Sequence, residues 1–204
     1  MDLIGLFIFF FAVIDPIGTV PVFIAVTHQY DQRMKRGIAV KATLSSAAIL
    51  IFFIVAGEIV LAAMDITLAA FQIFGGAVLF LFALTMIFGE SKPDQEVKLA
   101  TSGSDTAIFP LAVPSIAGPG AIMAAVLQTE NAKYNILEQI QTTAIILSVL
   151  VVVLILMLVA SWIHRVIGNS GASIISRVMG LIFGSVAVSN ILQGISTYFA
   201  FTPA

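Results

Sequence analysis

The 204-residue chain contains no cysteine and only two histidines, and charged residues make up just 10% of it. The lack of cysteine excludes disulfides, thiolate metal sites and a cysteine nucleophile. The two histidines, His28 and His164, lie far apart in polar stretches, so they do not predict a metal site. A net charge of −2 gives no electrostatic basis for binding nucleic acid. We therefore expect neither a metal nor a cofactor.

Apolar residues, in contrast, are abundant: 60% of the chain is hydrophobic, and its mean hydropathy is +1.11. Soluble domains are ~45–50% apolar and ~25% charged, so this chain lacks the polar residues to cover a surface facing water. A membrane-spanning helix needs about 20 mainly apolar residues. Six segments meet this requirement, at about residues 2–26, 38–62, 67–88, 106–129, 138–162 and 174–200. The sequence predicts an all-α membrane protein with six transmembrane helices.

The positive charges predict the orientation of these helices. With six spans, both termini share one side with the loops near residues 65 and 133. The other side carries eight of the nine Lys and Arg residues, namely Arg33, Lys35, Arg36, Lys41, Lys92, Lys98, Arg165 and Arg177. By the positive-inside rule, the loops near 28–41, 89–105 and 163–177 are cytoplasmic and both termini lie outside. The first apolar run has no basic leader or cleavage motif, so we do not expect a signal peptide.

Prolines interrupt the first and fourth spans near their middles. Pro16 and Pro21 are spaced like Pro114 and Pro119, at an offset of 98 residues. A proline inside a helix removes a backbone donor, and such backbone survives in a membrane only inside protein or along a watery cavity. The pattern predicts that helices 1 and 4 are broken at the bilayer midplane.

Glycines add a second correspondence, between the third and sixth spans. Gly75 and Gly89 match Gly180 and Gly194 at an offset of 105 residues. Together the two patterns predict a three-helix repeat at 1–89, a cytoplasmic loop at 90–104 and a second repeat at 105–204. Because three is odd, the second repeat crosses the membrane in the opposite sense, as an inverted repeat. The alternative is that these residues merely kink and pack membrane helices.

Broken helices in matching positions of two repeats are typical of a transporter's midplane binding site. The sequences Asp15-Pro16 and Gly118-Pro119 both resemble helix starts, with proline at the first helical position. Their N-termini would face the centre from opposite sides and attract a carboxylate. The predicted substrate site consists of residues in these two breaks: Asp15, Gly18, Thr19, Ser115, Gly118 and Gly120.

Two acidic residues lie inside spans and leave several roles open. Asp15 is a structural cap, a partner for an ammonium group or a proton site. Glu58 reaches the outer interface or couples an ion. The uncharged polar residues Gln72, Asn190 and Gln193 are expected to form hydrogen bonds between helices, and the neighbouring Gly75-Gly76 and Gly180-x-x-x-Gly184 to pack helices closely.

The chain resembles the MarC family of six-span bacterial and archaeal membrane proteins. The matching residues run in family order along nearly the whole chain. They are Ile14-Asp15-Pro16-Ile17-Gly18-Thr19-Val20-Pro21, Ala56-Gly57-Glu58, the stretch 75–82 that starts at Gly75-Gly76, the stretch 110–122 that holds Pro110, Pro114 and Gly118-Pro119-Gly120, and Arg177-Val178-Met179-Gly180. Thr19 stands where the family commonly has Asn, and it lacks the amide's second donor. The resemblance implies a protein of the prokaryotic inner membrane that transports small neutral amino acids such as alanine or glycine.

Three other classes of function are alternatives to a secondary transporter. A passive channel or pore for a small solute or ion is the main alternative. The motifs G-x-x-x-x-G-K-[ST], H-E-x-x-H and G-x-S-x-G are absent, so we expect neither nucleotide-driven transport nor an enzyme. A structural or partner-binding membrane protein is the third. For a transporter, a proton or sodium gradient is the expected driving force, and a homodimer is compatible with so thin a bundle.

Overall fold

The computed structural model describes residues 2–88 and 105–199, apart from the side chains of residues 164–170 and 172. Within these ranges the chain is helical and forms no strand. The elements are α1 (Leu3–Ile14), α2 (Pro16–Thr27), α3 (Gln32–Ala63), α4 (Leu68–Phe88), the π-helix η1 (Ala107–Ile116), α6 (Pro119–Leu127), α7 (Ile136–Leu158) and α8 (Ala160–Tyr198).

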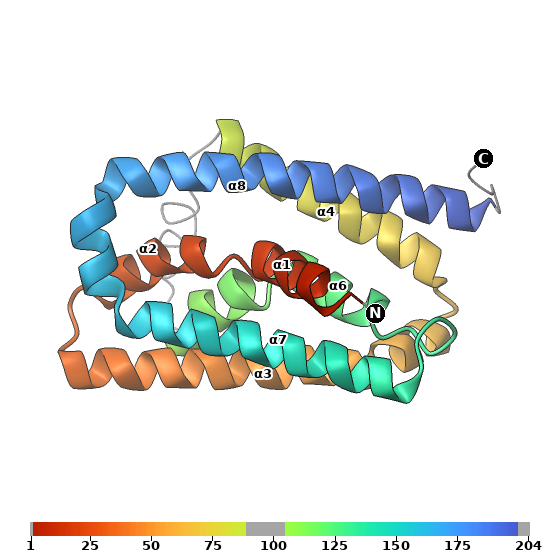
Figure 1. Cartoon of the computed structure of the whole chain (residues 1–204), viewed down its shortest axis with the longest axis horizontal. Helices are drawn as coiled ribbons and strands as arrows, with labels where there is room; N and C mark the ends of the chain where they lie inside the picture. The colour runs from red at the N-terminus through yellow and green to blue at the C-terminus, as the bar shows by residue number, and fades with distance from the viewer. Residues whose placement is uncertain (1, 89–104, 200–204) are drawn as a thin grey trace.

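Five segments are long and apolar enough to cross a membrane, and a bent pair of helices brings the number to six when it counts as one span. The five are Leu3–Thr27, Gln32–Ala63, Leu68–Phe88, Ile136–Leu158 and Ser173–Tyr198. The pair is η1 with α6, whose axes are bent by 57°. Within the described residues, the prediction of a helical chain with apolar segments long enough to cross a membrane is therefore confirmed. The polar stretch at 165–171, which we expected to be a loop, lies within α8 instead, and in Figure 1 this part of α8 crosses the end of the bundle before the helix turns along it.

Three of the long helices begin at side chains that accept hydrogen bonds from the first free backbone N–H groups. Asp2 caps α1, Asp31 caps α3, and Asn135 forms a capping box with Glu138 at the start of α7. Each such cap stabilises a helix by about 1 kcal/mol. These helix ends lie outside the apolar runs, where the sequence turns polar.

The helices form three layers (Figure 1). In one outer layer α4 packs along α8, and in the other α3 packs along α7. The middle layer holds α1, α2, η1 and α6. On one side of the middle layer, α2 packs on α8 and α6 packs on α4. On the other side, η1 packs on α3 and α1 packs on α7. The N-terminus, the end of α8 and the loops at 64–67 and 128–135 all lie toward one end of the bundle, referred to below as the terminal end.

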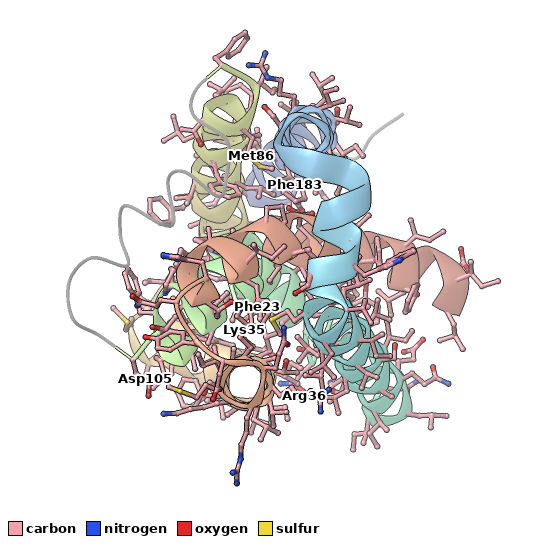
Figure 2. The ribbon with its side chains drawn as sticks, turned by 90° about the vertical axis from the view of Figure 1, so that its left-hand side faces the viewer. Phe23, Lys35, Arg36, Met86, Asp105 and Phe183 are labelled. Carbon is pink, nitrogen blue, oxygen red and sulfur yellow. The ribbon has the colours of Figure 1, made fainter. Side chains whose placement is uncertain are left out.

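The opposite end of the bundle carries basic residues. Figure 2 looks at this end and labels Lys35 and Arg36 of α3, together with the buried residues Phe23 of α2 and Met86 and Phe183 of the α4–α8 layer. Among the described residues, the only ion pair, between Lys41 of α3 and Asp105, joins α3 to the start of η1 here. Lys35, Arg36 and Lys41 therefore share one end of the bundle, whereas Lys92 and Lys98 of the predicted loop at 89–105 lie outside the described residues.

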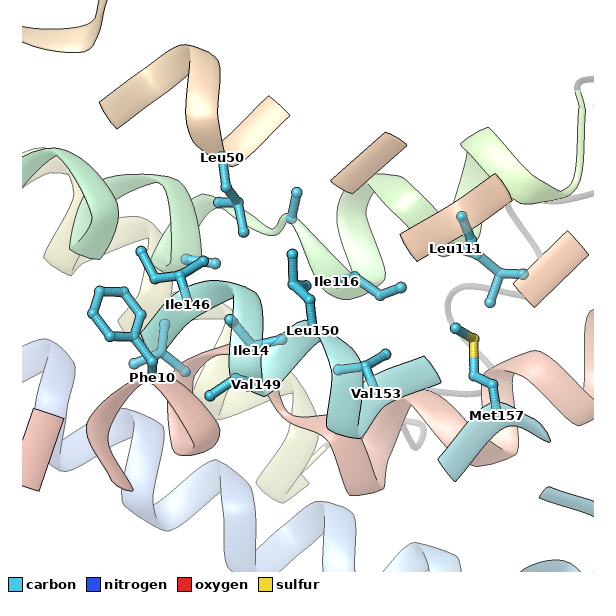
Figure 3. Packing of buried hydrophobic residues seen from close by; sticks show 14 of the residues in the cluster. Phe10, Ile14, Leu50, Leu111, Ile116, Ile146, Val149, Leu150, Val153 and Met157 are labelled. Atoms are coloured by element: carbon cyan, nitrogen blue, oxygen red, sulfur yellow. The ribbon is translucent and has the colours of Figure 1, made fainter. Parts of the chain in front are cut away.

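The main core surrounds α7, which buries a stripe at helical spacing. Residues from α1, α3 and η1 pack on this stripe (Figure 3), which consists of Ile146, Val149, Leu150, Val153 and Met157. A second, smaller cluster joins α4, α6 and α8 through residues such as Leu79, Met123 and Phe183. Because lipid is as apolar as these side chains, they stabilise the fold through close packing rather than through removal from water.

The α4–α8 layer depends on glycines. A Cβ atom at Gly76 would lie 3.0 Å from the carbonyl oxygen of Ala187, and one at Gly180 would lie 3.0 Å from that of Ala83. The absence of side chains lets the two backbones approach closely, as predicted for Gly76 and Gly180. Gly75, in contrast, faces the side chain of Met123 on α6.

Candidate functional site

Asp15 separates α1 from α2 in the middle of the first apolar segment. Its backbone is left-handed (φ 54°, ψ 64°), a conformation that Asp tolerates better than most residues. Its N–H donates to the carbonyl of Phe11 at 3.1 Å, and its own carbonyl accepts from the N–H of Thr19 at 3.1 Å. One residue thus ends α1 and begins α2, and it is buried, with 1% of its surface exposed.

The carboxylate of Asp15 caps the new helix. Its Oδ1 accepts a hydrogen bond from the N–H of Gly18 at 2.9 Å, and Pro16 occupies the first helical position. A Cβ atom at Gly18 would overlap the Asp15 carboxylate, so only glycine leaves room for it. The sequence Asp-Pro-x-Gly therefore encodes a helix start inside an apolar span. The capping role considered for Asp15 is observed.

Pro21 does not break the helix, contrary to the prediction. It lies within α2, which runs without interruption from Pro16 to Thr27. A proline in a helix removes one hydrogen bond and strains the preceding turn, which here bends the helix at most and leaves it continuous. The break in this segment belongs to Asp15 and Pro16 alone.

The second break is longer than the first. Within η1, Phe109 and Val113 adopt extended conformations, each directly before a proline, because the proline ring disfavours helical backbone in the residue that precedes it. Gly118 then serves as N-cap of α6, and Pro119 takes its first position. Unlike Asp15, Gly118 supplies no side-chain hydrogen bond to the new helix.

The structure brings the two breaks together. The hydroxyl of Ser115 donates to Oγ1 of Thr19 at 3.4 Å, and Thr19 donates to the backbone carbonyl of Asp15 at 3.1 Å. All three residues are buried. Three of the predicted site residues, from segments 96 residues apart in sequence, therefore share one polar contact in the middle layer.

Ser46 of α3 is a residue at the breaks that the sequence did not single out. It is fully buried, its hydroxyl donates to the carbonyl of Ala42 at 2.9 Å, and it lies 3.4 Å from the carbonyl of Ala112 in η1. A hydroxyl in an otherwise apolar stretch was the available signal. Gly120, in contrast, has a packing role: a Cβ atom there would lie 2.9 Å from Leu79 of α4 and 3.4 Å from Val13 of α1.

Glu58 lies away from the breaks, toward the terminal end of α3. Its Oε2 accepts hydrogen bonds from the backbone N–H of Asn131 at 3.0 Å and from the side-chain amide of the same residue at 2.7 Å. The preceding Gly57 packs closely against Val126 of α6. Glu58 therefore holds the loop between α6 and α7 and does not join Asp15.

A polar cavity of about 360 Å³, referred to below as the amide cavity, opens at the terminal end between the α4–α8 layer and the middle layer. On its wall the side-chain amide of Gln72 lies 3.3 Å from both Asn190 Oδ1 and Gln193 Oε1, which confirms the predicted hydrogen bonds between helices. A smaller cavity, of about 340 Å³, shares Gln128 and Tyr134 with it. The sequence did not predict the amide cavity, because four helices and a loop contribute to its lining.

Comparison with known proteins places this arrangement in a family. The family model described as MarC family integral membrane protein matches residues 2–199. A UPF0056 membrane protein of Methanocaldococcus jannaschii is 36% identical over 188 residues, which cover 91% of each chain. The UPF0056 membrane protein YvbG of Bacillus subtilis is 31% identical and covers 97% of this chain and 95% of its own. The UPF0056 membrane protein YhcE of Escherichia coli is 29% identical and covers 95% and 91%.

These relatives carry names that describe membrane location and state no activity. No solved structure gives a significant match. The match along nearly the whole chain, together with the helical segments described above, shows that the protein belongs to the MarC family of integral membrane proteins.

Proposed function

We propose that the protein is a secondary transporter of small neutral amino acids, with its substrate site where the two helix breaks meet near the membrane midplane. The observation that carries this proposal is the contact between two buried helix starts. Thr19 follows one start, Ser115 precedes the other, and their hydroxyls are hydrogen-bonded. Irregular backbone at this depth is typical of sites that bind a solute.

An inverted repeat, which this mechanism requires, is supported by the pattern of helix contacts. In the proposed correspondence, α3 contacts η1 and α6 just as α7 contacts α1 and α2. Likewise α4 contacts α6 just as α8 contacts α2. The larger contacts between layers thus have partners related by exchange of the two halves, whereas the small contacts of α8 with α1 and with α7 do not.

The proposed repeat also includes a residue correspondence between the halves. The two helix starts pair Pro16 with Pro119, an offset of 103 residues. The close contacts in the α4–α8 layer pair Gly76 with Gly180, an offset of 104 residues. The two offsets are nearly equal, whereas the proline and glycine patterns of the sequence have offsets of 98 and 105.

The two helix starts differ in a way that suits a zwitterion. The N-terminus of α2 already holds the Asp15 carboxylate, whereas the N-terminus of α6 has no side-chain cap. Backbone N–H groups and the helix dipole attract an anion at such a start. The substrate carboxylate would bind at α6 and its ammonium group would face Asp15. Proton or sodium coupling through Asp15, in addition to its cap, belongs to the same proposal.

The proposed orientation follows the positive-inside rule, with the basic end cytoplasmic and the terminal end outside a prokaryotic plasma membrane. In this orientation the amide cavity faces the outside. Cysteine residues introduced one at a time at Met64 or at Arg33 report the orientation directly, since a membrane-impermeant thiol reagent added to intact cells should label only the first of them.

The test of transport is uptake of labelled alanine and glycine into proteoliposomes, with and without a proton or sodium gradient. Asp15→Asn keeps a side-chain acceptor for the cap and removes the charge. Asp65→Asn is its matched control, because Asp65 also has a positive φ (56°) but lies in the loop between α3 and α4.

Saturable, gradient-dependent uptake that Asp15→Asn abolishes and Asp65→Asn retains would support a coupled transporter with Asp15 in its mechanism. Uptake that survives both substitutions would limit Asp15 to capping. Uptake without saturation or counterflow would favour the passive channel. If neither amino acid enters above the level of protein-free vesicles, the proposed substrate class is wrong.

A further inference from the structure

The amide cavity has the size and lining of a ligand site. Its volume, about 360 Å³, is at the lower end of the range of roughly 300–1,000 Å³ that is typical of small-molecule sites. Its walls come from α1, α4, α6 and α8 and from the loop after α6. A hydrogen bond of 2.9 Å between the hydroxyl of Tyr134 and Oε1 of Gln128 holds that loop beside the opening.

Four amide side chains line the cavity, and three of them, Gln72, Asn190 and Gln193, lie on α4 and α8. Gln72 of α4 is nearly buried, and its amide nitrogen lies within hydrogen-bond distance of Asn190 and Gln193 on α8. Amides both donate and accept hydrogen bonds and carry no net charge. Such a wall suits a solute that is polar but electrically neutral.

Two opposite charges lie at the same cavity. Glu130 and Lys133 both line it, and no ion pair joins them among the described residues. The Lys133 ammonium lies 5.6 Å from the centre of the Tyr134 ring, which holds it near the opening.

Three other acidic side chains at this end have structural partners. Asp2 caps α1, Glu58 binds Asn131, and Glu138 completes the capping box of α7. The side chain of Glu130 forms no hydrogen bond within the part of the chain that the structure describes. Separate charges of both signs beside a wall of amides match the two ends of a zwitterion.

Val13, Leu79 and Gly120, referred to below as the floor, lie between the amide cavity and the helix breaks. Phe9, Gln72 and Ala124 line the cavity on three helices. One or two helical turns farther toward the breaks on the same helices lie Val13, Leu79 and Gly120. The side chains of Leu79 and Val13 close on Gly120, where even a Cβ atom would be within 2.9 Å of Leu79. Thus α1 and α6, which carry Asp15 and Gly118 at their inner ends, also form the cavity wall.

From this arrangement we propose that the amide cavity is a binding chamber in which a small zwitterionic amino acid is held before it passes the floor to the breaks. Lys133 binds its carboxylate, Glu130 binds its ammonium group, and the amides of the wall supply further hydrogen bonds to these two groups. This inference rests on the proposed transport function and adds a second binding position to it.

The absence of native cysteine allows a direct test. Thr197→Cys places a thiol on the cavity lining and leaves the amides intact. Its rate of reaction with a membrane-impermeant thiol reagent is measured with and without alanine. The control is Met64→Cys, an exposed position in the loop between α3 and α4. We expect saturating alanine to slow labelling several-fold at position 197 and to leave position 64 unchanged.

A second pair of variants shows whether the amides cause this protection. Gln72→Leu, made in the Thr197→Cys background, should raise the alanine concentration for half-protection about fivefold, the equivalent of one hydrogen bond. Gln141→Leu on α7 is the same chemical change outside the cavity lining and should leave that concentration unchanged.

The outcomes distinguish this proposal from the transport function. Alanine uptake without protection at position 197 would overturn the chamber and leave transport standing. Protection without uptake would support the chamber and contradict transport. Protection equally sensitive to Gln72→Leu and Gln141→Leu would show that the amide wall does not bind the solute, and would also overturn the proposal.

Discussion

Substitution of Asp15 should separate its structural contribution from its charge. Asp15 suits its position in two ways: its carboxylate caps α2, and it tolerates the left-handed backbone found there better than most residues do. Alanine loses both. Loss of an N-cap costs about 0.5–2 kcal/mol, and a left-handed backbone costs an ordinary residue about 1–2 kcal/mol. We therefore expect Asp15→Ala to lower the free energy of unfolding by about 2–3 kcal/mol.

Two further substitutions at this position divide that total. Glycine adopts left-handed backbone freely and serves as an N-cap at a cost of only a few tenths of a kcal/mol. Asparagine keeps both a side-chain acceptor and a tolerance for this conformation. Asp15→Gly and Asp15→Asn should therefore each lose less than about 1 kcal/mol.

Reversible unfolding in mixed micelles of a mild detergent and sodium dodecyl sulfate measures these differences on one scale. The expected order of stability is wild type, Asn and Gly close together, and Ala well below. If Asp15→Asn is destabilised as much as Asp15→Ala, the charge itself stabilises the fold and the capping argument is wrong. If Ala is as stable as Gly, the left-handed backbone has no energetic role.

Three further predictions concern other parts of the structure. Gly180→Ala should destabilise the protein by about 1–3 kcal/mol, because its methyl group meets the backbone of α4, whereas Gly184→Ala, with 3.7 Å of clearance, should be neutral or stabilising in the same unfolding assay. Glu58→Leu should cost about 1 kcal/mol and speed hydrogen exchange in the loop between α6 and α7; unchanged exchange would mean that the loop holds itself. A hydrogen bond from Lys41, followed in importance by one from the Ala107 N–H, holds the pKa of Asp105 below its ordinary value of 3.8. Since the folded pKa is the lower one, this pair stabilises the protein above pH 3.8 and ceases to do so as the pH falls through the lowered folded value. Wild type and Lys41→Met should therefore converge in unfolding midpoint in acid, and a difference that persists would contradict the assignment.

Hydropathy predicted the membrane spans because each span is a local property of about 20 residues. The start of α2 was equally local, since Asp15 as cap and Pro16 at the first helical position are neighbours in sequence. Proline alone was a poorer guide. It signals a missing donor but not whether the helix continues, so Pro21 was mistaken for a break.

Most features that depend on distant segments were beyond prediction from the sequence. The partner of Glu58 lies 73 residues away, in a loop whose position depends on the packing of α6 on α3. The amides of Gln72 and Gln193 were expected to bond across helices, and they do. These amides also line a cavity, and that cavity exists only because two layers of helices leave a gap between them. No single segment of the sequence encodes such a gap.

The glycine contacts of the α4–α8 layer have a mechanical consequence. Gly76, Gly180 and Gly194 each bring one helix against the backbone of the other, at points spread along the pair. Helices in backbone contact at several places cannot slide or separate easily, so we expect α4 and α8 to move together as one rigid unit. The two helices begin at opposite ends of the bundle: α4 follows the loop before Leu68 at the terminal end, and α8 follows Val159 at the basic end. A displacement of this rigid unit at one end of the bundle should therefore be transmitted to the other end.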